Sequence, residues 1–132
     1  DMLLVNLQPQ VEQAPGLLGL FPTFSFYRVY QQGDVLPRHT DRPACEIALT
    51  LSVDYAGDCP WPLWIESSAG VTHFELGGGD ALLYRGIDCP HWREACPGER
   101  AVQVFLFYVD QDGPHAEWRF DKRDKLASFL SR

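Results

Sequence analysis

The sequence is poor in basic residues and in long apolar runs. It contains 11 Lys and Arg against 18 Asp and Glu, which gives a formal net charge of -7 and a pI near 4.9. Binding to a nucleic-acid backbone requires clustered Lys and Arg, so this composition argues against a nucleic-acid partner. No apolar segment approaches the ~20 residues that span a bilayer, and the first residues lack the basic and then apolar layout of a signal peptide. We therefore expect a cytoplasmic protein without a membrane partner.

Cysteine is also sparse. The four cysteines have no C-x-x-C spacing and are too few for a secreted disulfide scaffold; they are Cys45, Cys59, Cys89 and Cys96. Reduced thiols are the expected state, with a bridge between Cys89 and Cys96 as the alternative. The 132 residues suffice for a single domain, 1–132, whose core we place at 23–110. Because residue 1 falls inside a possible helix, we expect this domain to be truncated at its N-terminus.

The sequence does contain a series of short strand patterns. Residues 2–13 place apolar side chains at helical spacing before Pro15 and Gly16, which predicts one amphipathic helix. From Thr23 onward, aromatic and β-branched residues are interrupted by turn residues, and strands are expected at 24–30, 46–53, 62–66, 71–76, 81–84 and 101–109. This pattern predicts a mainly β protein, a jelly roll with the helix packed outside it.

The predicted strand at residues 46–53 alternates in character. One face has Glu46, Ala48, Thr50 and Ser52, and the other has Ile47, Leu49, Leu51 and Val53. If the apolar face packs against a helix or a second sheet, the small polar face is free to line a cavity. The alternative is a polar face that is simply open to water.

Residues 36–43 place an imidazole and a carboxylate two positions apart. Pro37 and Pro43 disfavour a helix, so the chain here is expected to be extended. In an extended chain residues i and i+2 point to the same side, so His39 and Asp41 converge. One imidazole and one carboxylate are two of the three ligands in the facial triad of non-haem iron sites. The alternative is a polar loop with a solvated His and Asp.

His91, just before the last predicted strand, is the candidate third ligand. Arg100 lies nine residues further on and shares one face of that strand with Val102, Val104 and Leu106. A buried guanidinium at the end of an apolar wall requires an anion, and its planar fork matches a carboxylate. The alternative for Arg100 is a surface charge at the start of a strand.

Taken in order, these residues resemble a family, the Fe(II)- and 2-oxoglutarate-dependent oxygenases, in particular their prolyl-hydroxylase-like branch. The resemblance extends over about residues 24–110. It depends on Tyr30-x-x-Gly33 before His39-x-Asp41, on Gly79-Asp80-Ala81-Leu82-Leu83, on Pro90-His91 and on Arg100.

The resemblance implies a cupin-like double-stranded β-helix in which His39, Asp41 and His91 hold Fe(II). It also implies that 2-oxoglutarate chelates the metal while Arg100 pairs with its distal carboxylate, so Arg100 has to face the metal cavity. Residues that match the surroundings of this cosubstrate in the branch are Tyr30, Ser52 and Leu63. The implied activity is a dioxygenase that uses O2 to hydroxylate a substrate, for example a protein or peptide side chain, and releases succinate and CO2.

Two other function classes remain open. One is a non-catalytic jelly-roll binding module whose histidines hold a structural metal, and the other is a cupin-type metalloenzyme that does not use 2-oxoglutarate. His73 is expected to be a surface histidine on a strand. The aromatic side chains Trp61, Trp64 and Trp92 are expected to fill or cover the core rather than line a substrate opening. A short helix is expected at 122–130.

Overall fold

Strands separated by turns make up most of the chain, as the alternation of side chains predicts. The computed structural model describes residues 2–14, 16–17, 19–56 and 60–124. In chain order the elements are α1 (Met2–Val11), β1 (Leu20–Gln31), β2 (Leu36–His39), the short 3-10 helix η1 (Pro43–Cys45), β3 (Ile47–Ala56), β4 (Leu63–Ser67), β5 (Gly70–Phe74), β6 (Ala81–Tyr84), β7 (His91–Arg93), β8 (Arg100–Asp110) and the 3-10 segment η2 (Ala116–Lys122). Within these ranges, no helix is long and apolar enough to cross a membrane.

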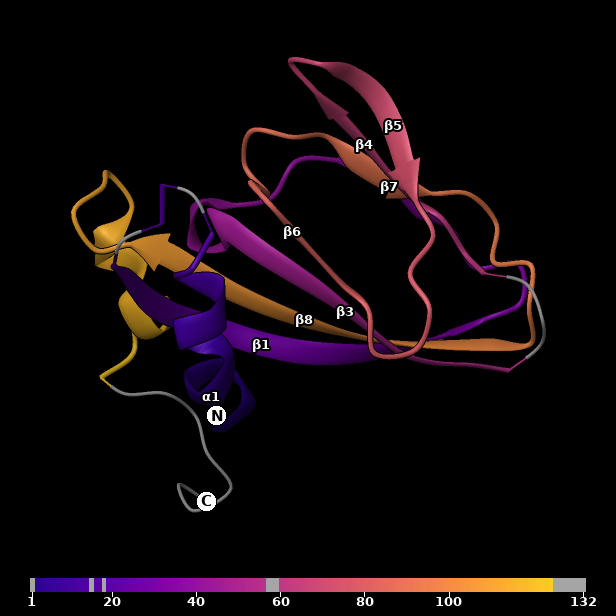
Figure 1. Cartoon of the computed structure of the whole chain (residues 1–132), viewed down its shortest axis with the longest axis horizontal. Coiled ribbons are helices and arrows are strands. Elements are labelled where there is room, and N and C mark those ends of the chain that lie inside the picture. Colours follow the sequence, from indigo (N-terminus) through magenta and orange to yellow (C-terminus); the bar gives the residue numbers. More distant parts are fainter. Residues whose placement is uncertain (1, 15, 18, 57–59, 125–132) are drawn as a thin grey trace.

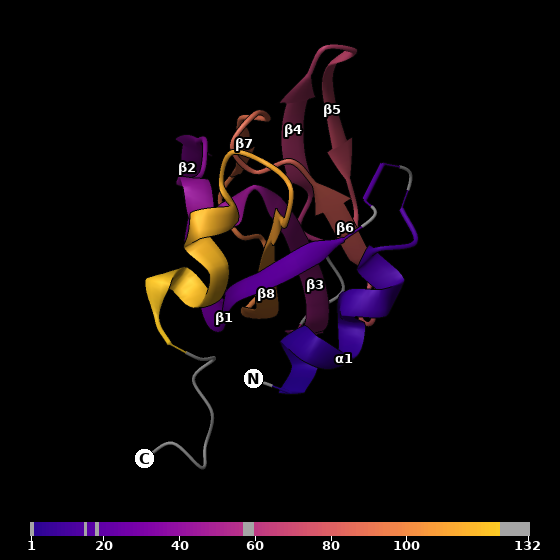
Figure 2. The same ribbon diagram turned by 90° about the vertical axis from the view of Figure 1, so that its left-hand side faces the viewer.

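The described strands pair into two antiparallel four-stranded sheets. The order in one sheet is β1-β8-β3-β6, and the order in the other is β2-β7-β4-β5. Figures 1 and 2 show the second sheet, with its protruding β4–β5 hairpin, standing over the first. Two facing sheets with these crossovers between them form a jelly roll. The predicted mainly β jelly roll is therefore confirmed.

The helix α1 packs against the outer face of the first sheet (Figure 1). Leu4 and Val11 of the helix belong to a buried cluster that also contains Ile47 of β3 and Leu106 of β8. The hydroxyl of Tyr108 donates a hydrogen bond of 2.6 Å to the Leu4 carbonyl oxygen. These contacts cover the apolar face of β3, and they confirm the predicted helix outside the jelly roll.

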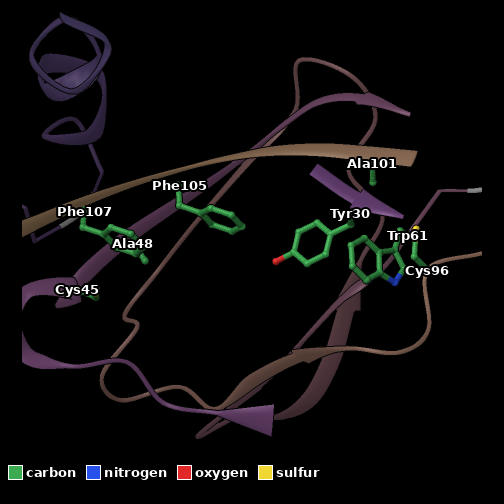
Figure 3. Packing of buried hydrophobic residues seen from close by; sticks show 8 residues of the cluster. All are labelled: Tyr30, Cys45, Ala48, Trp61, Cys96, Ala101, Phe105 and Phe107. Carbon is green, nitrogen blue, oxygen red and sulfur yellow. The ribbon is translucent and has the colours of Figure 1, made fainter. Parts of the chain in front are cut away.

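A second buried cluster lies between the two sheets (Figure 3). On β8, Ala101, Phe105 and Phe107 point into this cluster. Leu106, the residue between the two phenylalanines, points instead towards α1. The alternation of a β-strand thus gives β8 an inner face of odd-numbered residues and an outer face of even-numbered ones. The same alternation places Ala48 of β3 inside and its neighbour Ile47 outside.

Three local features, the strand β7, the segment after β8 and the cysteines, differ from the sequence predictions or complete them. The strand β7 lies where the sequence predicts no strand, because three residues are too few to show a periodic pattern. Residues 125–130 of the helix expected at 122–130 lie outside the described residues, and residues 116–122 before them form η2. Cys89 and Cys96 are free thiols, as is Cys45, so the alternative of a bridge does not hold. Cys59 lies outside the described residues.

Candidate metal centre

Strand pairing brings together three side chains that are far apart in the sequence. His39 ends β2 and His91 begins β7, and their Cα positions are partners in the antiparallel β2–β7 pair. Asp41 follows β2 by two residues, on the side where the extended chain directs His39. The candidate ligand atoms of His39, Asp41 and His91 all lie within 4.8 Å of one another.

The carboxylate of Asp41 is the centre of this cluster. Its Oδ1 atom lies 3.3 Å from Nε2 of His39 and 3.4 Å from Nε2 of His91. The two imidazole rings face each other with their centroids 4.4 Å apart. Two ring nitrogens and one carboxylate oxygen therefore converge on one small volume.

Backbone carbonyls fix the orientation of both imidazole rings. Nδ1 of His39 lies 2.7 Å from the carbonyl oxygen of Pro37, and Nδ1 of His91 lies 2.8 Å from that of Cys89. A carbonyl oxygen can only accept, so in each neutral imidazole the proton is on Nδ1 and the lone pair is on Nε2. Electron pairs of His39, Asp41 and His91 then face one another, and a shared cation would relieve their repulsion. This is the ligand geometry and supporting hydrogen bonding of a metal-binding histidine.

Gly86 holds the carboxylate in place, and the sequence patterns did not single it out. The backbone N–H of Asp41 donates to the Gly86 carbonyl oxygen at 2.9 Å. A Cβ atom at Gly86 would lie 2.3 Å from Oδ2 of Asp41 and 2.6 Å from the Cys45 carbonyl oxygen, so only glycine fits here. Oδ2 is buried and has no hydrogen-bond partner among the described residues. A cation bound to the Asp41 carboxylate would offset the cost of leaving this oxygen buried and unpaired.

The cluster opens into a cavity of about 190 Å³. The lining residues come from both sheets and are Phe26, Arg28, Tyr30, Leu36, His39, Asp41, Thr50, Leu63, Tyr84, His91, Phe105 and Phe107. The His91 side chain is buried, whereas the His39 side chain is 38% exposed. A metal held by two imidazoles and a carboxylate on one side keeps coordination positions open on the other. Here those positions can face the cavity.

Thr50 and Tyr84 supply a hydroxyl pair to the cavity wall. Their side-chain oxygens are 3.0 Å apart, and the Tyr84 ring contacts the edge of the His91 ring at a centroid distance of 4.9 Å. Burial raises the pKa of the Tyr84 phenol well above its usual value, so it stays protonated at neutral pH. Thr50 belongs to the polar face of β3, for which a cavity lining and a face open to water were the two alternatives, and of that face Thr50 lines the described cavity. Tyr84 was expected only to be part of a strand.

Of the residues predicted around the cosubstrate, some line the cavity and others do not. Tyr30 and Leu63 line the cavity. Figure 3 shows the Tyr30 ring between Phe105 and Trp61, with its hydroxyl directed away from Trp61. Ser52 is fully buried and does not line the cavity, and its Oγ accepts a hydrogen bond of 3.3 Å from Nε2 of Gln103.

Arg100 does not face the cavity. Its side chain is 53% exposed and lies 3.5 Å from the carboxylate of Asp54, which is also exposed. The expected alternation on β8 was right, but the face that contains Arg100 and Leu106 is the outer one, covered in part by α1. The prediction that Arg100 points to the metal is corrected here, and the geometry matches the alternative of a surface charge at a strand start.

Arg93 is the guanidinium that is buried between the sheets. It is two residues after His91 and therefore on the same face of β7, and its exposed fraction is 1%. It donates to the Trp61 carbonyl oxygen at 2.8 Å and to Oε1 of Gln103 at 3.0 Å, and it lies 4.7 Å from the Trp61 ring centroid. Its Nε has no partner among the described residues. We did not single out Arg93 from the sequence, because no strand was expected at residues 91–93 and the i, i+2 relation to His91 was therefore not apparent.

His73 and the three tryptophans Trp61, Trp64 and Trp92 lie away from the candidate metal ligands. His73 is exposed on β5, as expected of a surface histidine, and its ring contacts that of Trp64 at a centroid distance of 4.5 Å. Trp61 is buried, and Trp64 stacks on Trp92 with ring planes 10° apart. None of the three tryptophans lines the described cavity, in agreement with a role in filling or covering the core.

Comparisons with known proteins agree with this fold. No protein-family model matches the chain, and no curated protein matches it. A prolyl-4-hydroxylase from Pseudomonas putida has a similar structure over 63% of this chain and 50% of its own, with a TM-score of 0.55 and 18% identity. An oxidoreductase of the 2OG-Fe(II) oxygenase family from Burkholderia pseudomallei covers 72% of this chain and 47% of its own, with a TM-score of 0.60 and 13% identity.

A nickel complex of the non-heme monooxygenase ThoJ is similar as well. It covers 80% of this chain and 51% of its own, with a TM-score of 0.59 and 11% identity. The chain thus spans about half the length of these three structures. At such low identities the likeness establishes the fold alone, and it confirms the predicted double-stranded β-helix. This fold contains a His-Asp-His triad that can hold a metal ion.

Proposed function

We propose that the chain is the oxygenase domain of an Fe(II)- and 2-oxoglutarate-dependent dioxygenase that hydroxylates its substrate. The observation that supports this proposal most is the convergence of two Nε2 atoms and one carboxylate oxygen at the wall of an open cavity. Two imidazoles and one carboxylate are the ligands that non-haem Fe(II) oxygenases use. The fold, which is similar to those of proteins named as 2OG-Fe(II) oxygenase and prolyl-4-hydroxylase, adds to this support.

In this proposal His39, Asp41 and His91 hold the iron. The bound iron would supply the oxidation chemistry, in which O2 and 2-oxoglutarate are consumed and succinate and CO2 are released. The protein keeps the three ligand atoms in place through Gly86 and the two backbone carbonyls. The aromatic side chains that line the cavity would limit the contact of the bound iron with water.

We further propose that Arg93, rather than Arg100, pairs with the distal carboxylate of 2-oxoglutarate. Arg93 is opposite Leu36 in the β2–β7 pair, and Leu36 lines the cavity. Arg93 itself is not among the described lining residues, so the distal carboxylate would have to reach past Leu36 to meet it. Residues i and i+2 of a strand are about 6.6 Å apart, which is close to the reach of extended 2-oxoglutarate from a metal at His91. Nη1 and Nη2 of Arg93 already donate to Trp61 and Gln103, and Nε has no partner among the described residues, so an incoming carboxylate would be stabilised by the positive charge and by this free donor.

The other residues predicted near the cosubstrate are Ser52, Tyr30 and Leu63, and each has a place in this proposal. Ser52 is connected to Arg93 through Gln103, so its hydroxyl belongs to the same buried polar group. Tyr30 and Leu63 would form the cavity walls along the cosubstrate. Arg100 has no place in this arrangement because its side chain is on the outer face of β8.

Anaerobic spectroscopy tests the proposal. Addition of Fe(II) and 2-oxoglutarate to the protein is expected to give a weak visible charge-transfer band, and admission of O2 is expected to release succinate. His39→Ala should abolish the band, whereas the surface variant His73→Ala should retain it.

The other two function classes give different results. If Fe(II) binds but 2-oxoglutarate produces neither a band nor succinate, the chain is a metalloenzyme of the cupin type. If metal affinity is the same in the wild type and in His39→Ala, the chain is a binding module and the dioxygenase proposal is wrong.

A further inference from the structure

Besides the metal ligands and the hydroxyl pair of Thr50 and Tyr84, the cavity has a further polar feature, the guanidinium of Arg28. Arg28 is on β1, two residues before Tyr30, and both residues line the cavity. Asp41 is the one carboxylate among the described lining residues, and Arg28 is the one Lys or Arg. Arg28 is exposed, so it lies where the cavity meets solvent rather than deep between the sheets.

Two aromatic rings hold this guanidinium at the cavity. Its Cζ atom is 5.7 Å from the centroid of the Tyr30 ring and 6.0 Å from that of the Phe26 ring. Among the described residues, no carboxylate lies within ion-pairing distance of Arg28, unlike Arg38, Arg42 and Arg100. Arginine stacked on aromatic faces keeps its planar edge free for a bidentate anion. Arg28 thus presents unpaired donors at the entrance to the cavity that contains the candidate metal ligands.

The wall beside Arg28 is aromatic and partly uncovered. Phe26 points inward from β1, yet it is 41% exposed. Its ring lies 4.8 Å from that of Phe105 and 5.9 Å from that of Phe107, and all three rings line the cavity. An inward-facing aromatic surface left open to solvent is typical of a ligand-binding site. The surface offers stacking and apolar contact next to the guanidinium.

We propose that the substrate of the dioxygenase is a small carboxylic acid with an apolar, preferably aromatic, body. Its carboxylate would pair with Arg28 and its body would pack on Phe26, Phe105 and Phe107, within reach of the metal. This inference rests on the proposed function. Arg93 is the buried partner for the cosubstrate, whereas Arg28 is at the entrance, so the two guanidinium groups select different acids.

The size and charge of the site agree with this substrate class. A cavity of about 190 Å³ is small, so the part of the substrate that enters it beside a cosubstrate must be small. The chain has a net charge of -7, so long-range attraction does not favour polyanions. Recognition of an acid therefore depends on the local guanidinium, where a charged hydrogen-bond pair is strong.

Calorimetric titration of the Ni(II)-loaded protein with saturating 2-oxoglutarate tests the inference, because nickel replaces iron without turnover. The probes are phenylacetate and its neutral isostere phenylacetamide. We expect the acid to bind at least about tenfold more tightly than the amide in the wild type. Arg28→Gln should remove this preference, and Arg28→Lys should retain part of it because the charge stays.

Arg119→Gln is the matched control. Arg119 also stacks on two aromatic rings, those of Phe21 and Phe120, but it does not line the cavity. This variant should keep the wild-type preference for the acid. Circular dichroism of Arg28→Gln should match that of the wild type, since the replaced side chain is exposed.

Three outcomes would overturn the inference. The wild type could bind the amide as tightly as the acid, or Arg28→Gln could keep the preference for the acid. Alternatively, Arg28→Gln could weaken the binding of 2-oxoglutarate by the same factor as the binding of phenylacetate. Arg28 would then be a residue of the cosubstrate site. A failure of the dioxygenase proposal is distinguishable, because succinate release would then be missing while acid binding to the nickel protein is measured separately.

Discussion

Arg93 donates a hydrogen bond of 3.0 Å from Nη2 to Oε1 of Gln103, and both side chains are fully buried between the sheets. This bond fixes the Gln103 amide with its oxygen towards the guanidinium and its nitrogen towards Ser52. Trp61 completes the surroundings of Arg93 with its carbonyl oxygen and its ring. A positive charge is thereby held two residues from the metal ligand His91, without a carboxylate partner among the described residues.

Replacement of Arg93 tests its proposed role at the cosubstrate. Arg93→Gln should weaken binding of 2-oxoglutarate to the metal-loaded protein by about 10- to 100-fold, because hydrogen bonds to a charged group contribute about 1.5–3 kcal/mol. The intensity of the charge-transfer band during an anaerobic 2-oxoglutarate titration measures this affinity.

Arg100→Gln is the matched variant for that titration. Arg100 pairs with Asp54 on the exposed face, so its loss should change the affinity for 2-oxoglutarate by less than about twofold. Equal affinities in Arg93→Gln and the wild type, together with a clear loss in Arg100→Gln, would return the role to Arg100.

Replacement of the triad histidines tests the metal centre. His91→Ala should weaken Ni(II) binding by at least about 100-fold, since loss of even a residue that supports a metal ligand costs about 10- to 100-fold. Calorimetry with Ni(II) measures the change. His73→Ala removes an exposed histidine whose ring contacts that of Trp64, and it should leave the affinity unchanged. A metal affinity that persists in His91→Ala rules out this cluster as the binding site.

Gly86→Ala tests whether the close approach to Asp41 matters. The new Cβ would meet Oδ2 of Asp41 at 2.3 Å and the Cys45 carbonyl oxygen at 2.6 Å, so the carboxylate has to shift. We expect Ni(II) affinity to fall by about 10- to 100-fold, as for other residues that position a ligand. In Gly77→Ala the new Cβ would meet only Oδ2 of Asp80 at an ordinary 3.4 Å, so this variant should bind metal normally. Normal affinity in both variants would show that the close approach of Gly86 does not position Asp41 for metal binding.

Tyr108→Phe tests the attachment of α1. Loss of the hydrogen bond from Tyr108 to the Leu4 carbonyl oxygen should lower the free energy of unfolding by about 1 kcal/mol at neutral pH. Urea denaturation measures this change. Tyr27→Phe, at a tyrosine that is 72% exposed, should leave the free energy unchanged and serves as the control.

The same tyrosine gives the protein an alkaline instability. Burial raises the pKa of Tyr108, whereas in the unfolded chain a tyrosine ionises near about pH 10. Its contribution to stability is therefore complete below about pH 10 and decreases as the pH rises further towards the folded pKa, because only the unfolded chain then loses the proton. The thermal midpoint of the wild type should fall more steeply above pH 10 than that of Tyr108→Phe. Parallel pH profiles of the two proteins would contradict this assignment.

Local patterns predicted much of the fold and part of the site. Extended segments, turns and the helix followed from side-chain period and from Gly and Pro, and the pair of His39 and Asp41 followed from the i, i+2 rule. The strand β7 escaped prediction because three residues show no period, so Arg93 was not recognised beside His91. Gly86 escaped because its role depends on Asp41, which contacts it from a different part of the chain.

The sequence by itself determined which residues share a face of each strand, because alternation is a property of the local backbone. It also determined the spacing of the two candidate ligands in His39-x-Asp41. Only the tertiary structure decided which face of β8 points inward, because that depends on α1 covering Leu106 from outside. The same long-range packing placed His91 opposite His39, Arg93 between the sheets and Arg28 at the cavity entrance.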